Sequence, residues 1–159
     1  MGFRRTKDRV TVGSVPPDFT LPSQSGEMVS LGGFLGKRPV VLFFYPKDNT
    51  LGCTKEVCAF RDSFEELAKL DAEVIGISSD SVDSHKGFAE KHKLPFILLS
   101  DQGGKVRSLY GVPSTLGIFA GRVTYVIDED GVVRNVFSSQ IAVEKHVEEA
   151  LNTLDSIRT

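Results

Sequence analysis

The chain has 159 residues, 40% of them hydrophobic and 25% charged, which is enough to bury a full core, and one domain is the simplest count. Its formal net charge of -2 at pH 7 gives no sign of a nucleic-acid partner. Its apolar runs fall short of the ~20 residues that span a bilayer, so we expect a soluble protein with no membrane partner.

The first residues differ from the rest of the chain. Residues 1–9 are basic and lack a periodic pattern, so we expect a flexible N-terminal segment over 1–11 and a single domain over 12–159. The start Met1-Gly2 formally matches an acylation motif, but a cloning start or a trimmed targeting segment is the preferred interpretation.

The first predicted elements are a hairpin and a βαβ unit. The hairpin is formed by residues 19–21 and 28–31 around Ser25-Gly26. The apolar runs Val40–Tyr45 and Glu73–Ser78 predict a buried parallel pair of strands. Between them we predict a loop over residues 46–50 and a helix over residues 55–70 with one apolar face, so that Cys53 falls in the first helical turn.

The second half of the chain continues the alternation of helices and strands. A helix is predicted over residues 82–92, a short strand over 96–100 and a helical turn over 104–109. These elements extend the α/β pattern of the first half.

The chain is predicted to close with a hairpin and an amphipathic helix. Residues 123–128 and 132–138 alternate around the turn sequence Glu129-Asp130-Gly131. The helix covers residues 143–157, with its inward positions at Val143, Val147, Ala150, Leu151 and Leu154. Parallel strands early and an antiparallel pair late predict a mixed sheet in an α/β layer fold.

Cys53 is placed where a thiol becomes reactive. At a helix start, unpaired backbone N–H groups and the positive end of the helix dipole favour the thiolate, which is the nucleophilic form. We therefore expect Cys53 to be an exposed, anion-stabilised nucleophile. The alternative is that Cys53 and Cys58 are ordinary small apolar residues of the core.

The spacing of the two cysteines argues against a permanent disulfide. Residues five apart in an intact helix lie about 8.6 Å apart at the Cα, given a ~1.5 Å rise and ~2.3 Å radius. A disulfide usually needs Cα atoms within about 7 Å. Cys53 and Cys58 can therefore bond when the turn between them unwinds, as in a bond that forms and breaks during a cycle.

Several segments resemble one enzyme family. Pro46-x-x-x-Thr50-x-x-Cys53 resembles the peroxiredoxin active-site signature, and a cysteine five residues later resembles the peroxiredoxin Q branch, also called bacterioferritin comigratory protein. The similarity is closest to plant-type sequences, with one departure at Leu51, where many members carry Pro. It covers about residues 12 to 155 and includes the segments 15–22, 43–48, 58–62, 94–96, 99–101, 110–113 and 121–128.

The resemblance implies a fold and a reaction. The fold would be the α/β thioredoxin-like fold, with a central mixed sheet flanked by helices and an N-terminal hairpin extension. Cys53 would take one oxygen from hydrogen peroxide or an alkyl hydroperoxide and become a sulfenic acid, and Cys58 would condense with it into an intramolecular disulfide. Thioredoxin or a similar dithiol protein would reduce that disulfide.

The resemblance also implies the setting of the reaction. The cycle would need no cofactor and no metal. A monomer would suffice because both thiols lie in one chain, and the plant-type similarity points to the chloroplast, with the cytoplasm as the other location.

Three further residues would complete the site by resemblance, and each suits a physical need. Thr50 offers a hydroxyl for a peroxide oxygen and is also a credible helix N-cap. Pro46 has no N–H and would shield the thiolate, although it also suits a simple strand end. Arg122 offers a charged fork of donors for a thiolate and a polarised peroxide, whereas without the family it would be a solvated residue.

Other polar residues are given plainer interpretations. Glu56 lies one turn after Cys53 and could pair with Arg122, but a solvated carboxylate is favoured. His85, His92 and His146 are also interpreted as solvated. The glycine-rich segment at residues 32–38 has the wrong spacing for a phosphate loop.

Two questions remain open in the sequence. The loop over residues 113–121 could wall the active site or dock a reductant, and ordinary packing suits it equally well. The main alternative function is a peroxide sensor or redox relay that oxidises a partner protein. A thiol-disulfide oxidoreductase would usually carry Cys-x-x-Cys, which this chain lacks, and a flavodoxin-like binding domain would need a phosphate loop.

Overall fold

A mixed β-sheet forms the centre of the molecule. The structure, a computed structural model, describes residues 10–112, 114–115 and 119–158, and in these residues a five-stranded sheet has the order β5-β4-β3-β8-β9. The strands are β3 Val40–Phe44, β4 Glu73–Ser78, β5 Ile97–Ser100, β8 Val123–Ile127 and β9 Val133–Ser138. Each lies within a residue or two of its predicted range.

The strand directions confirm the predicted mixed topology. Strand β3 pairs with β4 in parallel, with Leu42 opposite Ile75, and β4 pairs with β5 in parallel. Strand β8 is antiparallel to both β3 and β9, and Leu42 also faces Tyr125 of β8. The predicted βαβ unit and the late hairpin are therefore both present.

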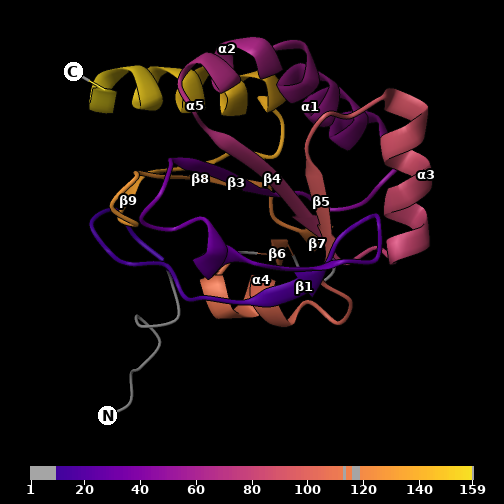
Figure 1. Ribbon diagram of the computed structural model, residues 1–159. Coiled ribbons are helices and arrows are strands. Elements are labelled where there is room, and N and C mark those ends of the chain that lie inside the picture. Colours follow the sequence, from indigo (N-terminus) through magenta and orange to yellow (C-terminus); the bar gives the residue numbers. More distant parts are fainter. Residues whose placement is uncertain (1–9, 113, 116–118, 159) are drawn as a thin grey trace.

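Helices cover both faces of this sheet (Figure 1). Helices α1 Leu51–Asp62, α2 Phe64–Lys69 and α5 Val143–Arg158 lie on one face. On the other face lie α4 Lys105–Tyr110 and the predicted N-terminal hairpin, formed by β1 Thr20–Pro22 and β2 Met28–Ser30. Helix α3 Val82–His92 lies beside β5 at the edge of the sheet.

The predicted helix over residues 55–70 is wrong in its extent. Helix α1 begins at Leu51, and it ends at Asp62 because Ser63 leaves helical geometry with φ -102° and ψ 9°. Helix α2 then begins at Phe64. Since Val57, Phe60 and Leu67 are all buried, the apolar period continues across the break, so periodicity alone could not reveal it.

Alternate residues of β3 enter two separate cores. Phe43 stacks on Phe60 of α1 with ring centroids 4.4 Å apart, on the side covered by α1 and α5. Phe44 packs against Tyr110 of α4 at 5.3 Å on the other side. Because both faces are covered, β3 is buried along its length and fixes the position of the loop that follows it.

Two smaller features complete the fold. Strands β6 Ser114–Thr115 and β7 Phe119–Ala120 pair antiparallel beyond α4. On α5, Val143, Val147, Ala150 and Leu154 are buried as predicted. In the described part of the chain no helix has the length and apolarity to cross a membrane.

Candidate active site

Cys53 lies in the first turn of α1, as the sequence predicts. Thr50 is the N-cap residue, with extended backbone at φ -94° and ψ 156°. The expectation of an exposed sulfur is wrong, because Cys53 is 1% exposed and packs in the same core as Val57. Cys53 belongs to the core cluster that includes Val41 and Phe43 of β3, so the thiol faces inward rather than toward solvent.

Arg122 brings a positive charge to the buried sulfur. It directly precedes β8 and is itself buried, and its Nη1 donates to Cys53 Sγ at 3.3 Å. The same Nη1 donates to Glu56 Oε1 at 2.7 Å, and Nε donates to the Gln140 carbonyl at 3.3 Å. Burial opposes the charge, but Glu56 and Cys53 outweigh it and raise the pKa of Arg122, so the guanidinium stays charged.

Gly52 leaves room for this guanidinium. A Cβ at position 52 would lie 3.1 Å from Arg122 Nη2, closer than ordinary contact allows. The glycine beside Cys53 therefore lets the arginine fork approach the helix start. This is a steric reason for a Gly-Cys pair that does not depend on backbone flexibility.

Glu56 is not the solvated carboxylate that the sequence analysis favours. It is fully buried, and burial raises its pKa to about 7 even though Arg122 acts in the opposite direction. Its Oε1 accepts from Arg122, while its Oε2 has no hydrogen-bond partner among the described residues. The position of Glu56 between Cys53 and Phe60 on the buried face of α1 is the sequence signal that could have revealed it.

His146 is also buried, contrary to the prediction that it is solvated. Its Nε2 faces the Ser139 carbonyl at 2.8 Å, and its Nδ1 lies 2.7 Å from Thr124 Oγ1. Burial lowers the pKa of His146, and although the Ser139 carbonyl opposes this, the ring is neutral. Nε2 therefore donates, Nδ1 accepts from Thr124, and the 3.7 Å contact between Nδ1 and Glu56 Oε2 is not an ion pair.

Thr50 and Pro46 lie in the loop that joins β3 to α1. The Thr50 hydroxyl donates to the Lys47 carbonyl at 2.8 Å, and within the described residues it makes no side-chain capping bond. Thr50 therefore occupies the predicted N-cap position, but its hydroxyl turns back into its own loop instead of capping the helix. Pro46 is half-buried at the end of β3, and its shielding of the thiolate stays a prediction.

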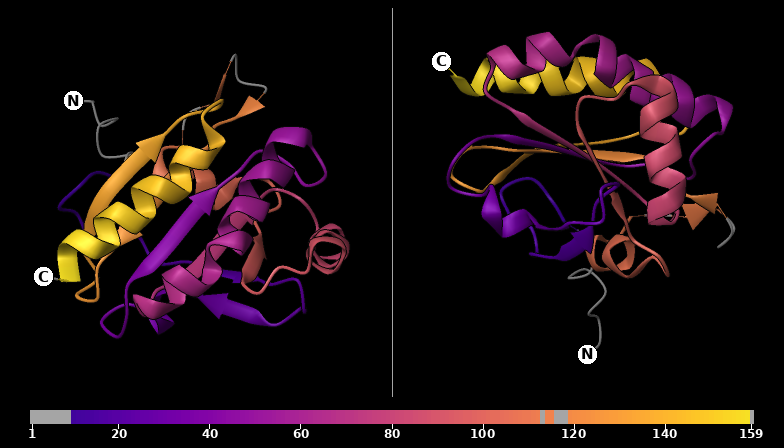
Figure 2. Two further views of the ribbon diagram at one scale, coloured as in Figure 1. Left: turned by 90° about the horizontal axis from the view of Figure 1, so that it is seen from above. Right: turned by 45° about the vertical axis from the view of Figure 1, so that its right-hand side comes forward.

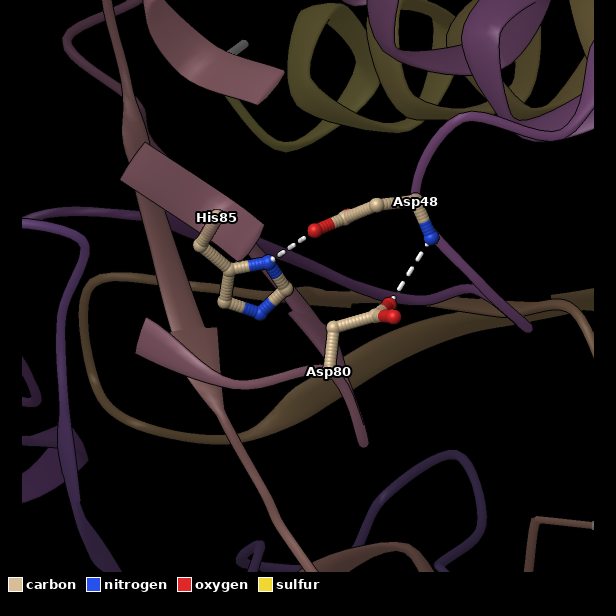
Figure 3. A group of neighbouring side chains, drawn as sticks. All are labelled: Asp48, Asp80 and His85. Carbon is tan, nitrogen blue, oxygen red and sulfur yellow. Dashed lines mark hydrogen bonds and ion pairs between the residues drawn. The ribbon is translucent and has the colours of Figure 1, made fainter. Parts of the chain in front are cut away.

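A buried network around Asp48 holds this loop in place (Figure 3). Asp48 Oδ2 lies 2.7 Å from His85 Nδ1 and accepts from Ser84 Oγ at 2.8 Å, and Oδ1 accepts from Tyr45 at 2.6 Å. The Asp48 backbone N–H donates to Asp80 Oδ2 at 2.8 Å. The loop before Cys53 is thus joined to α3 and to the end of β4.

His85 belongs to the interior, so its predicted solvation is wrong. Its side chain is fully buried, and Nε2 lies 3.0 Å from the Leu99 carbonyl while Nδ1 faces Asp48. Asp48, Asp80 and His85 offer atoms within 4.8 Å of one another, the spacing of a possible metal site in the described residues. These atoms already hydrogen-bond to neighbouring protein groups, so the group serves as a connection between elements.

Cys58 is separated from Cys53 by intact helix. Both thiols are free, and α1 is continuous from Leu51 to Asp62. The separation of about 8.6 Å expected for residues five apart therefore applies in this state. Cys58 is half-buried, and its sulfur lies 3.7 Å from Nδ1 of His92, which is half-buried rather than solvated.

One predicted feature falls on residues that the structure leaves undescribed. The loop over 113–121 contains residues 113 and 116–118, which lie outside the described residues. Its proposed place as a wall of the site or a docking surface stays a prediction.

Comparisons with known proteins agree with this geometry. A model of the AhpC/TSA family matches residues 12–136. Chloroplastic peroxiredoxin Q of Sedum lineare is 58% identical over 151 residues, covering 94% of this chain and 81% of that protein. The Arabidopsis thaliana protein of the same name is 55% identical over 147 residues, covering 92% and 68%.

Solved structures show the same similarity. Peroxidoxin BcpB from Mycobacterium tuberculosis is 42% identical and has a TM-score of 0.88. The alignment covers 95% of this chain and 100% of that chain. Peroxiredoxin Q from Xanthomonas campestris is 28% identical, with a TM-score of 0.82 over 94% and 98%.

Proposed function

The chain belongs to the AhpC/TSA family, in its peroxiredoxin Q branch, and from that premise we propose that Cys53 is the sulfur that attacks the peroxide. The protein is a thiol-dependent peroxidase with a thioredoxin-like fold. The observation that carries the assignment of Cys53 is the 3.3 Å contact from Arg122 Nη1 to its sulfur in a buried setting.

The geometry supports a displacement at oxygen. The Cys53 thiolate attacks one peroxide oxygen, the O–O bond breaks, and the sulfur becomes a sulfenic acid while the other oxygen leaves as hydroxide or alkoxide and takes up a proton. The guanidinium of Arg122 stabilises the thiolate before the attack and the developing negative charge during it. Thr50 orients the peroxide, and Pro46 limits the approach of water.

Cys58 completes the cycle in this proposal. Its sulfur attacks the Cys53 sulfenic sulfur, the S–O bond breaks, and water leaves as the disulfide forms. Because α1 separates the two cysteines, its first turns unwind before this step. An external dithiol of the thioredoxin class then reduces the disulfide by exchange.

We extend the proposal to the setting of the enzyme. Both thiols lie in one chain, which supports a monomer as the working unit. The five-stranded sheet joins strands from both halves of the chain, which supports one domain over residues 12–159. The relatives named chloroplastic support a location in the chloroplast.

Single-cysteine variants test the assignment. Cys53→Ser is expected to abolish peroxide consumption in the presence of thioredoxin and its reductase. Cys58→Ser is expected to consume one peroxide per chain and then stop, because the sulfenic acid is not resolved. Repeated turnover by the Cys53 variant would refute the assignment, and a wild type that stays oxidised under excess thioredoxin would favour a peroxide sensor instead.

A further inference from the structure

A histidine from another helix contacts the second cysteine. His92 is the last residue of α3, and its Nδ1 lies 3.7 Å from Cys58 Sγ on α1. Figure 2 shows α3 rising beside α1, which brings its last turn to the outer side of that helix. The contact joins residues 34 positions apart in the chain.

The structure holds this histidine in position from two sides. Arg61 Nη1 donates to the His92 backbone carbonyl at 2.9 Å. The Phe88 ring meets the His92 ring edge to face, with centroids 5.0 Å apart. Because Arg61 follows Cys58 by three residues, both lie on the same face of α1 and both contact His92.

The charges near His92 favour a neutral ring. Partial burial lowers its pKa, and the positive charges of Lys91 on the same helix and Arg61 on α1 lower it further. A neutral imidazole with its proton on Nε2 leaves a lone pair on Nδ1, the atom that faces the sulfur. A free cysteine thiol is mostly protonated at neutral pH, and the thiolate is the form that attacks.

We propose that His92 is the general base of the resolving step, an inference that rests on the proposed role of Cys58. Nδ1 takes the proton of the Cys58 thiol, and the resulting thiolate attacks the Cys53 sulfenic sulfur. The S–O bond breaks, and the departing hydroxide receives the proton from the imidazolium and leaves as water. Atoms and charge balance, and His92 returns to its neutral form.

The contact between Arg61 and His92 also decides which part of α1 moves. It joins the second half of the helix to α3, on the same face as Cys58. The first turn, which carries Cys53, has no side-chain N-cap bond in the described residues, and Arg122 contacts it from the start of β8 rather than from another helix. Cys53 therefore travels to Cys58, which stays beside its base during the reaction.

The test measures the two oxidation steps separately in the full chain. Rapid quenching after mixing with hydrogen peroxide, followed by a sulfenic-acid trap and mass spectrometry, gives both rates; the chain has no Trp to report by fluorescence. His92→Asn is expected to form the sulfenic acid at the wild-type rate, which also shows that the variant is folded. Formation of the disulfide is expected to slow by about 100-fold at pH 7, within the usual range for general-base catalysis.

The pH dependence of disulfide formation shows whether His92 acts as a base or only as a structural contact. In His92→Asn the disulfide rate is expected to depend more steeply on pH than in the wild type, because no imidazole then lies beside the Cys58 sulfur to take its proton. Lys91→Gln is the matched control, since it changes an exposed neighbour without touching the sulfur. It is expected to keep at least a third of the wild-type disulfide rate.

Each contrary result has a distinct meaning. A disulfide rate in His92→Asn that equals or exceeds that of the wild type, with the same pH profile, overturns the role of His92 as a base. A wild-type chain that forms no bond between positions 53 and 58 overturns the proposed function of Cys58, and the role of His92 with it.

Discussion

At the scale of single residues, one arginine serves two acidic groups. Arg122 Nη1 donates to both Cys53 Sγ and Glu56 Oε1, and all three residues are buried. A buried charge is costly unless it is paired, so Glu56 keeps Arg122 in place whether Cys53 is a thiol or a thiolate. The raised pKa of Glu56 shows that burial outweighs the attraction of the arginine.

The buried carboxyl of Glu56 makes the stability of the fold depend on pH. Burial raises the pKa of Glu56 from its ordinary value of 4.5 to about 7. Between these values the folded chain binds a proton that the unfolded chain releases, so the contribution of Glu56 to the free energy of unfolding falls as pH rises from about 4.5 to about 7. Glu56→Gln removes this contribution.

Urea unfolding from pH 4.5 to 8 measures this effect. The difference between the wild type and Glu56→Gln isolates one carboxyl from the other titrating groups. We expect the variant to gain in relative stability as pH rises through the window. Curves that stay parallel over the whole range would show that Glu56 titrates normally in the folded chain.

The same residues show what a sequence can and cannot reveal. Pro46, Thr50 and Cys53 can be selected because a signature contains them. Arg122 can be selected through the wider family resemblance, and the structure brings it to Cys53. The burial of Glu56, His85 and His146 was not predicted, because polar residues are usually exposed. Their positions gave a weak signal, since each lies on the apolar face of its helix, but the partners that satisfy them come from distant strands and loops.

At the scale of elements, helix α1 is held at both ends: the loop before it and its own second half are each bonded to other elements. Asp48 holds the loop before the helix through His85 and Asp80, and Arg61 holds the later turns through His92. The first turn of α1, between these contacts, carries Cys53, and Cys58 lies in the held second half. Local unwinding can therefore stay within the first half of α1 without disturbing the sheet.

Leu51→Pro tests the unwinding directly. Leu51 is the first helical residue and is 82% exposed, and Thr50 before it already has the extended backbone that a following proline requires. Proline at this position is expected to stabilise the folded chain by about 0.4–1 kcal/mol, because it restricts the unfolded chain. It should therefore slow formation of the disulfide without slowing formation of the sulfenic acid.

Leu51→Ala is the control for this variant, because it removes the exposed side chain and leaves the backbone free. Thermal unfolding and the same quenching experiment report both quantities. A Leu51→Ala variant that slows disulfide formation as much as Leu51→Pro would place the effect in the leucine side chain.

The bounds of most elements could be predicted, and the exceptions have physical causes. Helix α3 begins and ends at the predicted residues because Ser81 caps it through a bond from the Ser84 N–H, and Lys93 ends it in a left-handed conformation. The break at Ser63 was missed because Phe60, Phe64 and Leu67 keep the apolar period across it. The position of the break depends on how both helices pack against the sheet. The pattern of a single sequence does not show that packing.

At the scale of the whole molecule, the sheet places the reactive sulfur where strand β3 ends. Both faces of the sheet are covered, so the loop after β3 and the start of α1 are held by a rigid centre. Strand β8 is antiparallel to β3, so its first residue, Val123, pairs with Phe44 at the end of β3. Arg122 directly precedes Val123 and therefore lies beside the same end of β3. The mixed topology is therefore what brings the arginine and the helix start together.

This arrangement predicts that the oxidised enzyme stays a monomer. Two thiols five residues apart in one chain meet at an effective concentration on the order of millimolar once the turn unwinds, far above a micromolar concentration of chains. Oxidation with one equivalent of hydrogen peroxide is expected to remove two hydrogens from the mass of the chain, while sedimentation velocity still reports a single chain. Cys58→Ser supplies the contrast, because its Cys53 sulfenic acid can meet another thiol only in a second molecule. A wild-type disulfide that links two chains would contradict the intramolecular cycle, since it would show that α1 stays wound long enough for a slower encounter between molecules to win.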